Sequence, residues 1–365
     1  MDIQQLFSEA ARKEASDLHL VVGFPPMLRV SGVLFPVEGT SILTDEEAKS
    51  LIYGTFTADQ KDIYETNREI DYSLPTSVGR FRVNVYMQKT TIAGAFRLIP
   101  QQIKSIEALG LPEICHQFVK LRQGLVLVTG PTGHGKSTTL ASMINVINQG
   151  KATHIVTIED PIEYVYHPGQ SIVSQREMHS DTHSYNVALR SVLREDPDVV
   201  LIGEMRDFET IQSAITIAET GHLVFATLHT NSAAQTIDRI VDVFPENQQT
   251  QVRLQLSNVL EGVLSLRLIP ALSGGRVPAS EILTATPAVR TLIREGKTHQ
   301  IDNIIQTSAE FGMMTLETSL AQLVKAGVLG LDIASSYALR PEELGRLLKR
   351  TTRSEERRVG KECRL

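Results

Sequence analysis

Eight residues near position 130 have the types and spacing of a phosphate-binding loop. They read Gly130-Pro131-Thr132-Gly133-His134-Gly135-Lys136-Ser137, which fits the pattern G-x-x-x-x-G-K-[ST]. Glycines let backbone N–H groups turn toward phosphate oxygens, and a helix N-terminus adds a favourable dipole. Lys136 can reach the outer phosphates of a nucleotide, and the hydroxyl of Ser137 can ligate Mg²⁺. We therefore predict that these residues and Thr138 bind ATP together with Mg²⁺.

The flanking sequence supplies the structural context that such a loop needs. Residues 124–129 form a short apolar run typical of a strand, and residues 138–144 are a good helix start. A strand, a Gly-rich loop and a helix in this order define the P-loop. The alternative is a chance Gly-rich turn, for which this context would be a coincidence.

Acidic residues follow two further apolar segments. Glu204 comes directly after the run 199–203, and the cluster Glu159, Asp160 and Glu163 follows the run 154–158. Ligands of parallel α/β sheets bind at the carboxyl ends of the strands. Carboxylates there can hold Mg²⁺ or polarise an attacking water, and a cation would relieve the repulsion within the cluster. The alternative is that they are solvated carboxylates.

These acids can be divided by role. We predict that Glu204 is catalytic and polarises water or holds Mg²⁺ through water, and that Glu163 is a second catalytic residue that helps to position metal and water. Glu159 and Asp160 join Ser137 as predicted Mg²⁺ ligands.

Two histidines flank the apolar run 223–228, which places His222 and His229 at opposite ends of one expected strand. A single histidine is more often a hydrogen-bonded structural residue than a catalytic one. His229 would emerge beside Glu204, so we favour it as a sensor of the γ-phosphate. Zinc binding by the pair is disfavoured because no further Cys or His lies at ligand spacing.

Composition restricts the class of protein. The 365 residues are 42% hydrophobic and 21% charged, as expected of a globular protein with about two domains. No apolar run is long enough for a transmembrane helix, and the first residues lack the features of a signal peptide. Two cysteines form no metal cluster, which fits a cytoplasmic setting. The net charge of −6 argues against a nucleic-acid partner.

The chain divides by pattern into an α/β core with smaller parts on either side. Alternating strand and helix signals indicate a parallel α/β sheet after about residue 115, whereas the first 100 residues indicate an α+β domain. Residues 353–363 resemble the translation of a sequencing adapter; the alternative is a genuine basic tail. The predicted parts are residues 1–100, a linker at 101–115, a core at 116–285, a helical region at 286–350 and a non-native tail at 351–365.

Four motifs in this order closely resemble those of the secretion ATPases of the type II/type IV pilus class, and most closely the pilus-retraction motors. They are the P-loop, the acidic segment 158–164, the segment Leu201–Asp207, and the histidine segment that runs from Ala218 to Asn231. Residues 288–295 also resemble a C-terminal A-I-R-N-L-I-R-E motif, from which Val289 and Thr291 depart. His134 departs from the commonest loop of the family, which carries Ser there. The resemblance covers nearly all of residues 1–350.

The resemblance implies a fold, an assembly and further site residues. It implies a RecA-like P-loop core, an N-terminal PAS-like domain and a ring-shaped homohexamer at the cytoplasmic face of the inner membrane. It further implies that arginines of the N-terminal domain enter the nucleotide cleft, and Arg82 and Arg97 are the matching positions. The implied activity is ATP hydrolysis that acts on a membrane platform protein to withdraw pilin subunits.

Several alternatives remain open at this point. Pilus-assembly and type II secretion ATPases usually carry a four-cysteine zinc insertion, which a chain with two cysteines cannot build. An accessory retraction ATPase is closer, either as the identity of this chain or as a second retraction ATPase that partners it. A nucleotide-binding structural ring and a nucleic-acid motor are more distant, and phosphate release and DNA-stimulated turnover would separate them.

Overall fold

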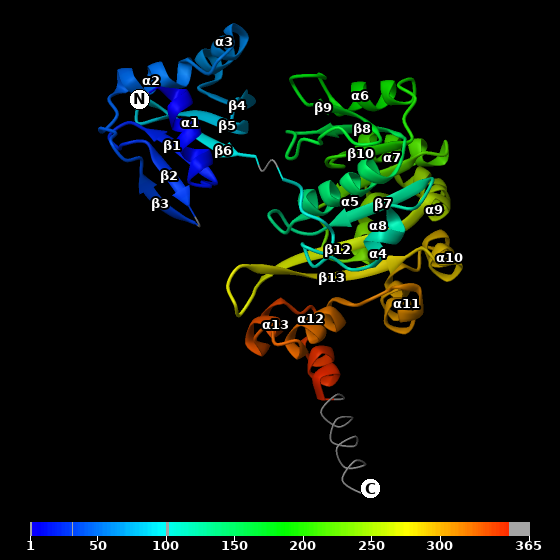
Figure 1. The fold of residues 1–365 in the computed structure, drawn as a ribbon. Coiled ribbons are helices and arrows are strands. Elements are labelled where there is room, and N and C mark those ends of the chain that lie inside the picture. Colours follow the sequence, from blue (N-terminus) through cyan, green and yellow to red (C-terminus); the bar gives the residue numbers. More distant parts are fainter. Residues whose placement is uncertain (1, 31, 100–101, 350–365) are drawn as a thin grey trace, which may run out of the picture. The chain divides into compact units, whose positions relative to one another are not determined.

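The structure, a computed structural model, describes residues 2–30, 32–99 and 102–349. Contacts group residues 1–103 and 161–165 in a first unit and residues 104–160 and 166–365 in a second (Figure 1). The proposed tail at 351–365 lies outside the described residues. The domain boundaries predicted from sequence stay predictions.

The first unit is built on a six-stranded antiparallel sheet in the order β3-β2-β1-β6-β5-β4. Its strands are β1 Asp17–Val21, β2 Met27–Val30, β3 Val33–Pro36, β4 Glu69–Thr76, β5 Gly79–Gln88 and β6 Thr91–Leu98. Its helices are α1 Ile3–Arg12, α2 Asp45–Tyr53 and α3 Ala58–Asn67. Residues 81–86 and 92–98 alternate with period two, which predicts paired strands, and they pair as β5 and β6.

Local sequence explains why these helices begin where they do. Thr44 with Glu47 three residues later is the sequence pattern of a capping box, and it forms at the start of α2. Each side chain accepts a hydrogen bond from the other's backbone N–H. The apolar face of α1 packs on the sheet, where the ring of Phe7 lies 4.5 Å from that of Phe81.

The second unit contains a seven-stranded sheet in the order β13-β12-β7-β11-β10-β8-β9. Its strands are β7 Gly124–Thr129, β8 His154–Glu159, β9 Ile172–Glu177, β10 Val199–Ile202, β11 Leu223–Leu228, β12 Leu260–Pro270 and β13 Arg276–Thr284. All neighbours are parallel except β12 and β13, which form a hairpin. The four strands predicted in the core are confirmed, and so is the α/β fold class with its parallel sheet.

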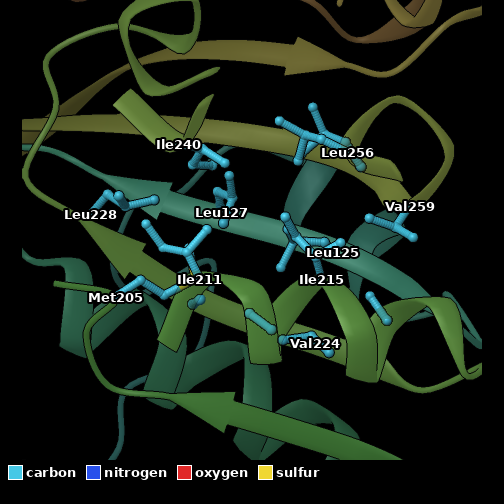
Figure 2. Packing of buried hydrophobic residues seen from close by; sticks show 14 of the residues in the cluster. Leu125, Leu127, Met205, Ile211, Ile215, Val224, Leu228, Ile240, Leu256 and Val259 are labelled. Atoms are coloured by element: carbon cyan, nitrogen blue, oxygen red, sulfur yellow. The ribbon is translucent and has the colours of Figure 1, made fainter. Parts of the chain in front are cut away.

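Helices cover this sheet because its central strands are apolar on both faces. Every residue of β7, β10 and β11 is buried. The helices are α4 Ile114–Phe118, α5 Lys136–Gly150, α6 Tyr185–Val192, α7 Phe208–Glu219, α8 Ala233–Asp242 and α9 Glu246–Val259. Figure 2 shows Leu125 and Leu127 of β7 among side chains from α7, α8 and α9. This packing fixes the strand that leads into the phosphate-binding loop.

The C-terminal part is helical, as predicted. Its helices are α10 Pro287–Glu295, α11 Ile301–Thr307, α12 Leu316–Lys325 and α13 Leu331–Tyr337, and residues 341–349 are also helical. One detail of our prediction for α10 is wrong. The pattern of residues 288–295 predicts that Ala288, Leu292 and Ile293 lie on the apolar face of the helix. Ala288 is instead exposed, whereas Val289 and Ile293 are fully buried one helical turn apart.

Arg290 fastens α10 to the end of α9. Its guanidinium donates hydrogen bonds to the backbone oxygens of Ser257 and Asn258, both 2.8 Å away, and pairs with Glu261 at 2.8 Å. The carbonyl groups in the last turn of a helix have no partner within the helix, so a cation there satisfies and stabilises them. Arg290, the first arginine of the A-I-R-N-L-I-R-E-like segment, therefore has a structural role.

We expect Arg290→Ala to lower the free energy of unfolding by about 2 kcal/mol, since it removes several charge-assisted hydrogen bonds at a half-buried site. Denaturant unfolding measures the effect. Arg294→Ala, an exposed arginine on the same helix, is the control and should change stability by less than about 0.5 kcal/mol. Equal effects of the two variants would contradict the capping role.

Candidate nucleotide-binding site

The predicted nucleotide-binding residues of the second unit meet at the carboxyl edge of its sheet. Thr129 of β7 lies opposite Leu228 of β11, and Ile202 of β10 lies opposite Ile158 of β8. The phosphate-binding loop, His229, Glu204 and Asp160 all follow these strand ends. This is the edge at which ligands of open α/β sheets bind. His222 lies at the other end of β11, where its Nδ1 is 3.0 Å from the hydroxyl of Thr220 and 3.1 Å from the carbonyl oxygen of Ile217.

The loop from Gly130 to Gly135 has the conformation that its glycines predict. Gly130, Gly133 and Gly135 have φ values of 138°, 77° and 87°. A Cβ atom at Gly130 would also overlap the carbonyl oxygen of Leu266 on β12. Helix α5 begins at Lys136, so the helix N-terminus faces the turn and can receive an anion. Ser137 and Thr138 lie in the first turn of this helix.

A continuous set of polar contacts joins three of the predicted site residues. The Lys136 ammonium donates to the carbonyl oxygens of Gly130 and Pro131, at 2.9 and 3.1 Å. The same ammonium lies 3.4 Å from Nδ1 of His229. On the other side of the ring, Nε2 of His229 lies 3.1 Å from a carboxylate oxygen of Glu204. The structure thus places His229 between Lys136, the predicted phosphate-binding lysine, and the proposed catalytic carboxylate of Glu204.

Three contacts in this site were missed by sequence reasoning. Arg206 donates to the second oxygen of Glu204 at 2.8 Å and lies 3.9 Å from the carboxylate of Asp160. Thr132 of the loop lies 3.4 Å from Nδ1 of His229. For the contact between Arg206 and Glu204, the only signal in the sequence was that the two residues lie two positions apart. Charged residues with this spacing are common on protein surfaces, so the signal is not specific.

The contacts of Glu204 decide its protonation. Burial alone favours the neutral acid, but the hydrogen bond and charge of Arg206, together with those of His229, outweigh burial. The pKa of the Glu204 carboxyl therefore lies below its usual value. Glu204 is an anion at neutral pH, as a group that orients and polarises water must be.

The remaining predicted residues differ in their surroundings. Glu159 is buried at the end of β8, where Thr157 and Gln175 donate to one of its oxygens at 2.7 and 3.3 Å. Asp160 is partly exposed beside Arg206. With the Ser137 hydroxyl, these groups are the hard oxygen donors that suit Mg²⁺. Their role as metal ligands stays a prediction.

Glu163, Arg82 and Arg97 belong to the first unit, so their predicted roles at the nucleotide stay predictions. Arg82 and Arg97 are exposed and lie directly opposite each other on β5 and β6. Asp17 holds Arg97 at 2.9 Å, which offsets part of the repulsion between the two arginines.

The fold and the site together define a P-loop ATPase. The family model for type II/IV secretion system proteins matches residues 1–330, and the chain belongs to this family. It is 48% identical to the type IV pilus retraction ATPase PilT of Pseudomonas aeruginosa over 94% of this chain and 99% of that protein. It is 37% identical to the type IV pilus ATPase PilU of the same organism over 96% and 92% of the two chains.

A solved structure agrees with these sequence comparisons. The crystal structure of the pilus retraction motor PilT with bound ADP matches with a TM-score of 0.89 and 46% identity, over 95% of this chain and 99% of that one. The two chains therefore share one fold over almost their whole lengths. Within the described part of the chain, no helix has the length and apolar character needed to cross a membrane.

Proposed function

We propose that this protein is the ATP-hydrolysing motor of type IV pilus retraction, the process behind twitching motility. The observation that carries the proposal is the set of contacts that joins Lys136, His229 and Glu204 at the carboxyl edge of the sheet. The similarity to PilT over almost the full length of both chains supports it. The lower identity to PilU makes an accessory retraction ATPase the second candidate.

The residues of the site have separate roles in ATP hydrolysis. A water molecule attacks the γ-phosphorus of ATP, and the bond from that phosphorus to the bridging oxygen of ADP breaks. Glu204 orients this water and receives its proton, because its carboxylate is ionised and held by Arg206. Lys136 offsets charge on the phosphates, and His229, which contacts both groups, senses the γ-phosphate.

Mg²⁺ bound with the nucleotide would neutralise charge that develops between the β- and γ-phosphates. Ser137 with Glu159 and Asp160 would hold it. We further propose that Glu163 assists in positioning water. Arg82 and Arg97 would act on the phosphates from the N-terminal domain, in a homohexamer whose subunits share each cleft.

We place the protein in the cytoplasm, peripheral to the inner membrane. Its proposed partner there is the platform protein of the pilus, and a second retraction ATPase is a further proposed partner. Loss of retraction on deletion of the gene in its host, restored by the wild-type gene, would support this placement. Unchanged retraction would favour the accessory role. DNA-stimulated phosphate release would instead revive the nucleic-acid motor.

Lys136→Ala tests the nucleotide site directly. We expect it to weaken binding of a fluorescent ADP analogue by about 10- to 100-fold, since it removes charge-assisted hydrogen bonds to phosphate. Lys325→Ala, an exposed lysine on α12, is the matched control and should bind as the wild type does. Wild-type affinity of Lys136→Ala would exclude the proposed site.

A further inference from the structure

Strand β12 runs along the phosphate-binding loop and touches it at successive positions. The hydroxyl of Thr129 donates to that of Ser265 at 2.9 Å, deep in the sheet. One residue further, Gly130 leaves room for the carbonyl of Leu266. The phosphate-binding loop therefore lies beside β12 from the first residues of the loop onward.

Both strands of the β12–β13 hairpin form hydrogen bonds with the tip of the loop. The backbone N–H of Leu268, on β12, donates to Nδ1 of His134 at 3.0 Å. The guanidinium of Arg276, on β13, donates to the carbonyl of Gly133 at 3.1 Å. The side chain of Leu268 also lies against Gly135, where an added Cβ atom would come within 3.3 Å of it.

The contact from Leu268 requires one protonation state of His134. Nδ1 can accept only in the neutral imidazole with its proton on Nε2, because both nitrogens of an imidazolium are donors. Burial, followed by the charges of Arg267, Arg276 and Lys136, lowers the pKa of His134. These cations lie on β12, β13 and α5.

We propose that His134 is a positioning residue whose neutral imidazole fixes the tip of the phosphate-binding loop against β12 and so sets the affinity for nucleotide. The proposal rests on the nucleotide site proposed above. His134 occupies the position at which the commonest loop of the family has Ser. Its contact with β12 gives the side chain a structural role that the G-x-x-x-x-G-K-[ST] pattern does not require. A loop held in its binding conformation loses less entropy when nucleotide binds.

Three variants of the full chain test this role: His134→Ala, His134→Asn and Arg276→Ala. We expect His134→Ala to weaken binding of a fluorescent ADP analogue about tenfold and to raise the KM for ATP, with kcat within about twofold of wild type. His134→Asn should restore affinity to within about threefold, because its amide oxygen can accept from Leu268. Arg276→Ala should weaken binding, and its combination with His134→Ala should cost less than the two separately.

The pH dependence of nucleotide affinity is a further test, because a merely structural role of His134 would not change it. Wild-type affinity should fall as His134 is protonated at low pH, and His134→Asn should lack that component. Wild-type affinity in His134→Ala, or no rescue by His134→Asn, would overturn the proposal. Lys136→Ala separates this proposal from the proposed nucleotide site. If Lys136→Ala binds the ADP analogue as tightly as the wild type, the proposed nucleotide site itself is wrong. If Lys136→Ala binds weakly but His134→Ala binds with wild-type affinity, only the role of His134 is wrong.

Discussion

Glu204→Gln is expected to lower the rate of ATP hydrolysis by at least about 100-fold while nucleotide affinity stays within about threefold of wild type. The amide keeps the size of the side chain and can still accept a hydrogen bond from Arg206. It cannot take a proton from water, and it carries no negative charge to orient one. The loss should therefore fall on kcat, because in the proposed mechanism the carboxylate acts in the transition state and not in binding of the phosphates.

Steady-state phosphate release and binding of a fluorescent ADP analogue measure the two quantities separately. Glu246→Gln, an exposed acid at the start of α9, is the matched control and should turn over normally. Turnover of Glu204→Gln near the wild-type rate would show that another group activates water. A wild-type protein that binds nucleotide but releases no phosphate would instead support the alternative of a nucleotide-binding structural ring.

The parts of this site that sequence predicts are those that depend on strand ends. Once 124–129, 199–202 and 223–228 are recognised as buried parallel strands, their carboxyl ends must share an edge. The loop, Glu204 and His229 then meet of necessity, and the structure places His229 3.1 Å from Glu204. Local signals such as the Thr44 capping box are predictable for the same reason, since all their atoms lie within one turn.

The parts that sequence does not predict depend on distant pairing. We assigned no strand at β12, which follows α9 without a turn signal, and none at β9, an edge strand that begins with the exposed Ile172. Without β12, nothing indicates that the backbone of Leu268 reaches His134. The error at Ala288 has a related cause: a helix of nine residues has few apolar positions, and its neighbours decide which of them are buried.

Buried ionisable groups are the hardest features to predict, and Glu281 on β13 is the clearest case. Its side chain is almost fully buried in a strand whose sequence gives no sign of it. One carboxylate oxygen accepts a hydrogen bond from the backbone N–H of Ala233, at the start of α8, at 2.7 Å. Burial nonetheless dominates, and with the charge of Asp302 it raises the pKa of Glu281 to about 7, although Arg340 opposes the shift.

Glu281→Gln is therefore expected to stabilise the protein at pH 8 by about 3 kcal/mol, the cost of holding a charge at this site. In the unfolded chain the carboxyl titrates near 4.5, and in the fold it titrates near 7. Below pH 4.5 both states carry the proton, and the fold has its full stability. As pH rises to 7 the unfolded chain loses its proton first, so wild-type stability falls. Glutamine does not titrate, and its amide oxygen can still accept from Ala233.

Denaturant unfolding at a series of pH values between 4.5 and 8 measures the difference between Glu281→Gln and wild type. The gain should be near zero at the acid end and should grow until the pH passes 7. Glu310→Gln, an exposed acid in the same region of the chain, should show no such trend. A variant less stable than wild type at pH 8 would mean that the Ala233 N–H and Arg340 stabilise the carboxylate more than burial disfavours it, so that Glu281 is ionised in the fold and anchors α8 as an anion.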